Sequence, residues 1–293
     1  MPFPERARRS RRWWLHVFLF LLTFITTTAF GYALRLSFAA GHSLDYGFIV
    51  DGYLRLFKGD HVIWSGAVYS LPVLSILLAH EFGHFIACQR WGVNATLPFF
   101  LPSPTLLGTL GAFIRIPAPI YNRRSLFDIG VSGPIAGFVV LVPFLAVGVW
   151  MSHVVPSANS NDSLIFGTPL LMRVFESVRF PHVEPVNIAL HPVAVAAWAG
   201  LLATSINLLP AGQLDGGHIL YAVGGARMHR LASFAVIVLL VLLAFLISYW
   251  PSLIWAVLLF FFRRHPLVYD NESLGKPRLA ISALALGILV LSI

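Results

Sequence analysis

The chain has 293 residues, of which 58% are hydrophobic and only 11% are charged, and its mean hydropathy is +0.80. A soluble domain carries about a quarter charged residues, so this composition excludes an ordinary soluble enzyme and indicates an integral membrane protein. The net charge of +8 would suggest nucleic acid in a soluble protein, but the basic residues stand beside apolar runs, so we expect no nucleic-acid partner.

Apolar runs of about twenty residues recur along the chain, and as helices they would cross a hydrocarbon core of roughly 30 Å. The first run follows a cluster of arginines and is longer than a typical signal core, so we expect a retained membrane anchor. A shorter apolar segment at 251–262 either crosses or dips and returns, which makes six or seven transmembrane helices. The other expected spans are 13–34, 63–88, 125–152, 191–210, 231–250 and 279–293.

Arginines near the span ends favour one orientation, because short cytoplasmic loops keep positive charge during insertion. The N-terminus therefore lies in the cytoplasm, and the arginines of later loops also fall inside when 251–262 crosses, which favours seven spans over six. The segments 35–62 and 153–190 then lie outside, and the second is too short for an ordinary globular domain. The later arginines are Arg90, Arg115, Arg123, Arg124, Arg227, Arg230, Arg263 and Arg264.

The stretch from 97 to 120 departs from the helical pattern. Five prolines bar a long helix, and glycines inside a strand-prone run permit a tight bend. Irregular backbone is tolerated at membrane depth only where protein or a water-filled cavity satisfies it. We therefore expect an all-α polytopic membrane protein with a re-entrant, β-hairpin-like segment, and the alternative for this stretch is an ordinary cytoplasmic loop.

The sequence His-Glu-Phe-Gly-His at 80–84 lies inside the apolar run 63–91. On a helix, His80 and His84 share one face about 6 Å apart along the axis, as two ligands of one tetrahedral zinc require. Glu81 lies about 100° round the helix, where it can act as general base toward a metal-bound water. Ionisable groups in an apolar span cost several kcal/mol unless paired or bound to metal, which favours catalysis over a polar helix face.

A catalytic zinc site needs a third protein ligand. The metzincin continuation fails because Ala87 and Arg90 stand where glycine and histidine would be, and the glutamates lie in the outside loop or the C-terminal tail. Asp128 and Asp215 are the aspartates at span edges on the same side as the histidines. Asp215 is favoured because the two glycines after it allow close backbone approach, although a helix cap is the alternative role.

His218 stands three residues after Asp215. Metal ligands are usually oriented by outer hydrogen bonds, so His218 is a candidate partner of the site. The alternative is a histidine that faces the cytoplasmic interface.

Several separated motifs together resemble the site-2 protease family of intramembrane zinc proteases. The similarity covers about 63–225, and the absence of room for a PDZ-type domain in 153–190 resembles the branch that lacks one, which includes plastid relatives. The motifs are the histidine pair with its glutamate at 80–84, the glycine hairpin at 108–111, Asp-Ile-Gly-Val-Ser-Gly-Pro at 128–134 and Asn-Leu-Leu-Pro-Ala-Gly-Gln-Leu-Asp-Gly at 207–216.

This resemblance implies the rest of the site. It assigns the third ligand of one zinc ion per chain to Asp215, and it implies that Asn207 contacts substrate or transition state. It also implies that the hairpin around Gly108 and Gly111 binds substrate as an added strand, and edge pairing would unwind a helical target. A bacterial inner membrane is favoured as the location, with a plastid membrane as the alternative.

We therefore expect a zinc metalloendopeptidase that cleaves a single-span membrane protein within or near its transmembrane segment, in regulated intramembrane proteolysis. One alternative is a non-enzymatic metal or ion transporter, since buried ionisable groups also mark transport pathways. Another is a membrane-anchored zinc protease with a cytosol-facing site. The expected parts are an N-terminal segment with anchor and outside loop (1–62), a catalytic membrane core (63–225) and a C-terminal membrane segment (226–293).

Overall fold

The computed structural model describes residues 13–41, 46–55, 60–104, 107–117, 120, 122–155, 167–246, 248–266, 268–269 and 272–293. Its α-helices are α1 Trp13–Ala40, α2 Tyr46–Arg55, α3 Asp60–Arg90, α4 Arg123–Trp150, α5 Leu170–Arg179, α6 Pro192–Leu208, α7 Asp215–Leu246, α8 Pro251–Phe262 and α9 Gly275–Leu291. Two small antiparallel sheets pair β1 Phe99–Pro102 with β2 Thr109–Phe113, and β3 His153–Val154 with β4 Ile188–Ala189. The predicted fold class, a helical membrane protein with a hairpin, is confirmed.

Helices lie at all seven predicted span positions. Among the described residues, α1, α3, α4 and α7 are long and apolar enough to cross a membrane, whereas α6 and α8 are apolar but shorter. The count of six or seven spans therefore stays a prediction. The helix at the predicted span 231–250 starts earlier than that span, because α7 begins at Asp215 and continues across a break at Gly225 to Leu246.

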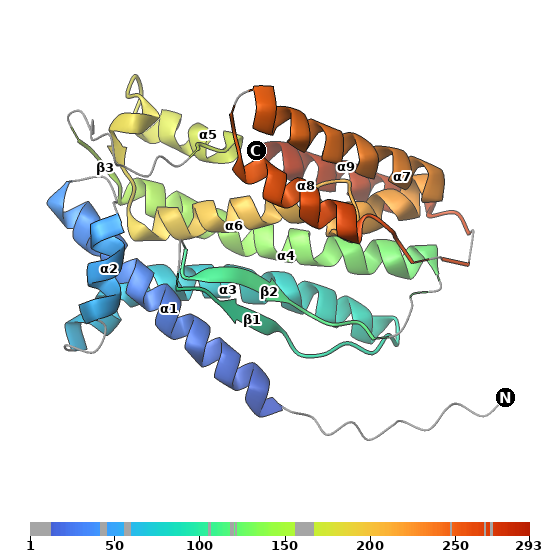
Figure 1. Cartoon of the computed structure of the whole chain (residues 1–293), viewed down its shortest axis with the longest axis horizontal. Helices are drawn as coiled ribbons and strands as arrows, with labels where there is room; N and C mark the ends of the chain where they lie inside the picture. The colour runs from blue at the N-terminus through green and yellow to red at the C-terminus, as the bar shows by residue number, and fades with distance from the viewer. Residues whose placement is uncertain are drawn as a thin grey trace.

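Helix α4 lies at the centre of the arrangement. Figure 1 shows α4 and α6 in the middle, with α1, α3 and the β1–β2 hairpin on one side and α7, α8 and α9 on the other. Because α4 packs against both α3 and α7, elements from distant parts of the chain meet along it. This placement brings the two motifs predicted to share a metal ion to two helices that both pack against α4.

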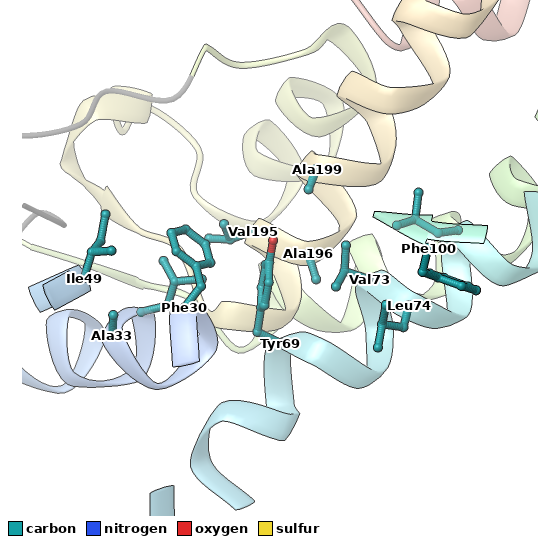
Figure 2. Packing of buried hydrophobic residues seen from close by; sticks show 12 residues of the cluster. Phe30, Ala33, Ile49, Tyr69, Val73, Leu74, Phe100, Val195, Ala196 and Ala199 are labelled. Carbon is teal, nitrogen blue, oxygen red and sulfur yellow. The ribbon is translucent and has the colours of Figure 1, made fainter. Parts of the chain in front are cut away.

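A cluster of buried side chains joins α1, α3 and α6 (Figure 2). Phe30 and Tyr69 are fully buried, and their rings meet edge to face with centroids 5.2 Å apart. The Tyr69 hydroxyl donates a 3.0 Å hydrogen bond to the carbonyl oxygen of Leu107, in the turn between β1 and β2. The same packed cluster therefore also fixes the turn of the hairpin.

The hairpin lies along α1. His16 Nδ1 is 3.0 Å from the carbonyl oxygen of Pro98 at the base of the hairpin, and the Thr26 hydroxyl donates to the carbonyl oxygen of Gly108 at its turn, 2.6 Å away. Ten helical residues separate His16 from Thr26, which is about 15 Å along the helix axis. A strand pair of this length beside an apolar helix favours the re-entrant segment over an ordinary loop.

The predicted outside segment 153–190 contains short elements in its described part. Strands β3 and β4 pair at its two ends, and the amphipathic α5 lies between them. The backbone N–H of Leu170, which opens α5, donates to the carbonyl oxygen of Ile293 at 2.8 Å. The segment thus covers one end of the bundle close to the end of α9.

Candidate functional site

Three side chains from two distant motifs converge between α3 and α7. Nε2 of His80 lies 3.2 Å from Nε2 of His84, and Oδ2 of Asp215 lies 3.2 Å and 3.3 Å from these two nitrogens. Zinc bonds to imidazole nitrogen and carboxylate oxygen are about 2.0 Å long, so two ligands of a tetrahedral zinc lie about 3.3 Å apart. The triangle formed by the three atoms matches one face of such a tetrahedron.

The cluster is withdrawn from solvent. The side chains of His80 and His84 are 7% and 8% exposed, and that of Asp215 is 15% exposed. Among the described residues, these three form the only group of three or more histidine, cysteine or acidic side chains with ligand atoms close enough to share one ion. The donor set of two imidazoles and one carboxylate suits zinc and leaves a fourth position for water.

A second contact orients one imidazole. Nδ1 of His84 lies 2.7 Å from the carbonyl oxygen of Ile129 on α4, to which it can donate. A proton held on Nδ1 leaves the lone pair of Nε2 for the metal, as is usual for metal-bound histidines. The local structure therefore supplies the tautomer that a ligand needs.

Glycines of α4 make the space for the histidines. A side chain at Gly133 would overlap the ring of His84, and a Cβ at Gly137 would lie 3.2 Å from the Cβ of His80. The two glycines stand four residues apart and so share one helix face. The motif Ser-Gly-Pro, which sequence reasoning used only for recognition, thus forms the wall against which the ligands pack.

Asp215 is the first residue of α7, and the close approach of this helix start to α6 depends on the glycines that follow. A Cβ at Gly216 would overlap the carbonyl oxygen of Leu208, and one at Gly217 would lie 2.5 Å from that of Gly212. Only glycine permits the start of α7 to lie this close to the end of α6. The predicted close backbone approach therefore occurs as a contact between these two helices.

The other candidate aspartate is engaged elsewhere. Asp128 accepts 2.8 Å hydrogen bonds from Nε and Nη2 of Arg278 on α9, and Oδ2 also lies 3.2 Å from the indole nitrogen of Trp91. These contacts join the ends of α3, α4 and α9. The preference for Asp215 over Asp128 agrees with this geometry.

Glu81 belongs to α3, lies next to the cluster of His80, His84 and Asp215, and is 5% exposed. Its carboxylate interacts electrostatically with His80, His84 and Asp215, and with the backbone N–H of Ile114 just beyond β2. The carboxylate therefore lies between the metal ligands and the hairpin. Sequence reasoning had no signal for the contact with Ile114, because it arises from the packing of the hairpin on α3.

The predicted substrate contacts fall in different places. Nδ2 of Asn207 lies 3.4 Å from Nε2 of His80, so the amide faces the cluster. Gly111 has a φ of 101° and open space where a side chain would be, whereas Gly108 packs closely against Thr26 and Thr27 of α1. The close packing against α1 therefore explains a glycine at position 108 without a contact to substrate.

His218 is outside the metal cluster and is bonded to a residue that sequence reasoning missed. Nδ1 of His218 lies 2.7 Å from Nε2 of His265, and Nδ1 of His265 lies 2.6 Å from the carbonyl oxygen of Pro266. Burial lowers the pKa of His265, which favours a neutral ring that donates from Nδ1 to Pro266. His218 then donates to His265, so its tautomer is fixed from the α8–α9 linker.

Comparison with known proteins agrees with the motifs. Residues 68–249 match the model of Peptidase family M50. The chain is 30% identical over 244 residues to the probable zinc metalloprotease EGY2, chloroplastic, of Arabidopsis thaliana, covering 81% of this chain and 42% of that protein. It is 31% identical over 230 residues to the probable zinc metalloprotease EGY1, chloroplastic, of the same plant, covering 75% and 41%.

A solved structure is also similar. The site-2 protease from Methanocaldococcus jannaschii matches with a TM-score of 0.41 and 16% identity, over 83% of this chain and 92% of that one. The chain spans less than half the length of the curated relatives it matches. The family model covers more than half of the chain, so the chain belongs to peptidase family M50.

Proposed function

We propose that the chain is an intramembrane zinc metalloprotease that hydrolyses a peptide bond within or near the transmembrane segment of another membrane protein. The observation that carries this proposal is the triangle of His80, His84 and Asp215 inside an apolar helical bundle. The family membership and the relatives named as zinc metalloproteases support the same reading. One zinc ion per chain is expected, because the described residues hold one such cluster.

The mechanism follows from the placement of the residues. A zinc ion held by His80, His84 and Asp215 would supply Lewis acidity toward the scissile carbonyl and its attacking water. Glu81 is placed to take the proton of that water and later to protonate the leaving amine. The amide of Asn207 faces the same space and would hold the substrate carbonyl in register.

The hairpin would present the substrate. Arg115 both donates from its backbone to Thr96 and accepts from it, so its polar backbone groups face the β1 side. The backbone N–H of Ile114, the residue before Arg115, instead interacts with the carboxylate of Glu81. A substrate strand paired along this part of the hairpin would bring a peptide bond beside the catalytic carboxylate.

The surroundings of the enzyme are part of the proposal. The substrate would be a single-span membrane protein, and water would reach the site from the cytoplasmic side if the N-terminus lies inside. The relatives named as chloroplastic support a plastid membrane as the location. The bacterial inner membrane is the location that the sequence resemblance favours. The segment 63–225 would form the catalytic core.

A transporter is the main rival, and one observation disfavours it. A pathway for ions would recur as polar clusters along several spans. The described residues instead hold one metal-binding group, with Glu81 beside it.

The test uses the purified full-length chain and a membrane-spanning model substrate. Glu81→Gln should lower cleavage by about 10²–10⁴-fold while the zinc content stays near that of the wild type. The matched control is His182→Ala, since His182 is an exposed histidine of the outside segment and should leave both quantities unchanged. The protease would be refuted if the wild type did not cleave the substrate and Glu81→Gln kept partial transport activity. If Glu81→Gln lost its zinc together with its activity, Glu81 would be a metal ligand.

A further inference from the structure

Helix α7 is two helices joined at a break. Gly225 has φ 75° and ψ −179°, a conformation that favours glycine and interrupts helical hydrogen bonding. The segment 215–224 is therefore a separate short helix with Asp215 at its first position. Where a helix ends, its last carbonyl groups lose their helical partners and need others.

Arg123 supplies those partners. Its Nε and Nη2 donate to the carbonyl oxygen of Ala222 at 3.0 Å and 2.5 Å, and Nη2 also donates to that of Val223 at 3.2 Å. Ala222 is fully buried, so water does not replace the guanidinium there. A cation at the C-terminal end of a helix also interacts favourably with the helix dipole.

The short helix connects this contact to Asp215 at its opposite end. Seven residues separate Asp215 from Ala222, which is about 10 Å along the axis. Arg123 is the first residue of α4, the helix whose Gly133 faces His84. The same helix, α4, thus contacts both the histidine and the short helix that carries the carboxylate.

We propose that Arg123 is a positioning residue of the metal site, which holds the short helix 215–224 so that Asp215 reaches the two imidazoles. The proposal rests on the proposed function, in which Asp215 binds zinc. It assigns a role to an arginine whose sequence context indicated only membrane topology.

The neighbouring Arg124 provides a matched control. Its side chain pairs with the exposed Glu272 at 3.0 Å and donates to the carbonyl oxygen of Ser273, away from the short helix. Exposed pairs of this kind contribute little to stability. Removing either arginine costs the same single positive charge beside the same span, so effects on membrane topology are equal in the two variants.

The experiment compares Arg123→Met, Arg123→Lys and Arg124→Met in the full-length chain. Zinc affinity is measured by competition with a chelator, and hydrogen exchange is followed for the amides of 216–223. Arg123→Met should weaken zinc binding about ten-fold, the scale of a lost contact behind a metal ligand, and should speed exchange. Arg123→Lys should restore part of both quantities, and Arg124→Met should match the wild type.

Equal zinc affinity and equal exchange in Arg123→Met and Arg124→Met would overturn the proposal. If Arg123→Met does not fold, Arg123→Lys against Arg124→Lys decides by the same two readouts. Asp215→Ala separates this proposal from the proposed function. Unchanged zinc affinity in Asp215→Ala would refute Asp215 as a ligand, and the exchange rates would still show whether Arg123 holds the helix.

Discussion

The carboxyl groups of Asp215 and Glu176 are both withdrawn from water, and they differ in what surrounds them. Asp215 lies 3.2 Å and 3.3 Å from the nitrogens of two imidazoles. Glu176 on α5 is only 4% exposed, and its Oε2 has no hydrogen-bond partner in the part of the chain that the structure describes. Convergence of ligand atoms, rather than burial alone, therefore distinguishes the proposed metal site from a buried acid.

The largest effect is expected at the acid beside the metal ligands. Glu81→Gln removes the proton acceptor but keeps the size and shape of the side chain, so cleavage should fall by about 10²–10⁴-fold. Single-turnover assays of a membrane-spanning substrate measure the fall. Glu176→Gln in the same assay should leave the rate unchanged. An equal loss of rate in both variants would mean that Glu81 has no catalytic role beyond that of any buried acid.

The next largest effect is expected where α4 makes room for a ligand. Gly133→Ala would place a methyl group against the ring of His84, so zinc affinity should fall at least about ten-fold. Gly287→Ala on α9 is the control, because nothing lies within 4 Å of its added Cβ. Chelator competition gives both affinities, and wild-type binding in Gly133→Ala would mean that the ligands do not pack there.

A smaller effect is expected from the partner of His218. His265→Ala frees the ring of His218 without touching a ligand, so the cleavage rate should fall by less than about ten-fold with zinc content unchanged. Gln213→Ala is the control, since Gln213 holds the same linker through Arg264 but does not contact His218. Equal rates in the two variants would leave His218 with no part in the reaction.

The smallest effect concerns stability at Glu176. Burial raises the pKa of Glu176 from 4.5 to about 7, so the folded state favours the protonated acid. This contribution to stability is complete below pH 4.5 and is lost as pH rises through about 7. Glu176→Gln should remove that pH dependence from thermal unfolding, whereas Glu184→Gln, at an exposed position of the same segment, should retain it.

The sequence predicted which side chains come together at the proposed metal site, because the spacing of the two histidines is a local feature of one helix. His80 and His84 lie one turn apart on a helix, and the glycines after Asp215 indicate close approach. The break at Gly225 was not predicted, and the hydrogen bonds of Arg123 were missed because they form between α4 and the distant α7. His265 was missed for the same reason, because nothing in the linker sequence indicates a bond to His218.

The zinc-to-protein ratio of purified wild type beside Asp215→Ala is the decisive test of the proposed metal site. We expect a ratio near one for the wild type and a large loss of zinc from Asp215→Ala under the same mild chelator. Equal zinc retention by the two proteins would contradict the proposed site.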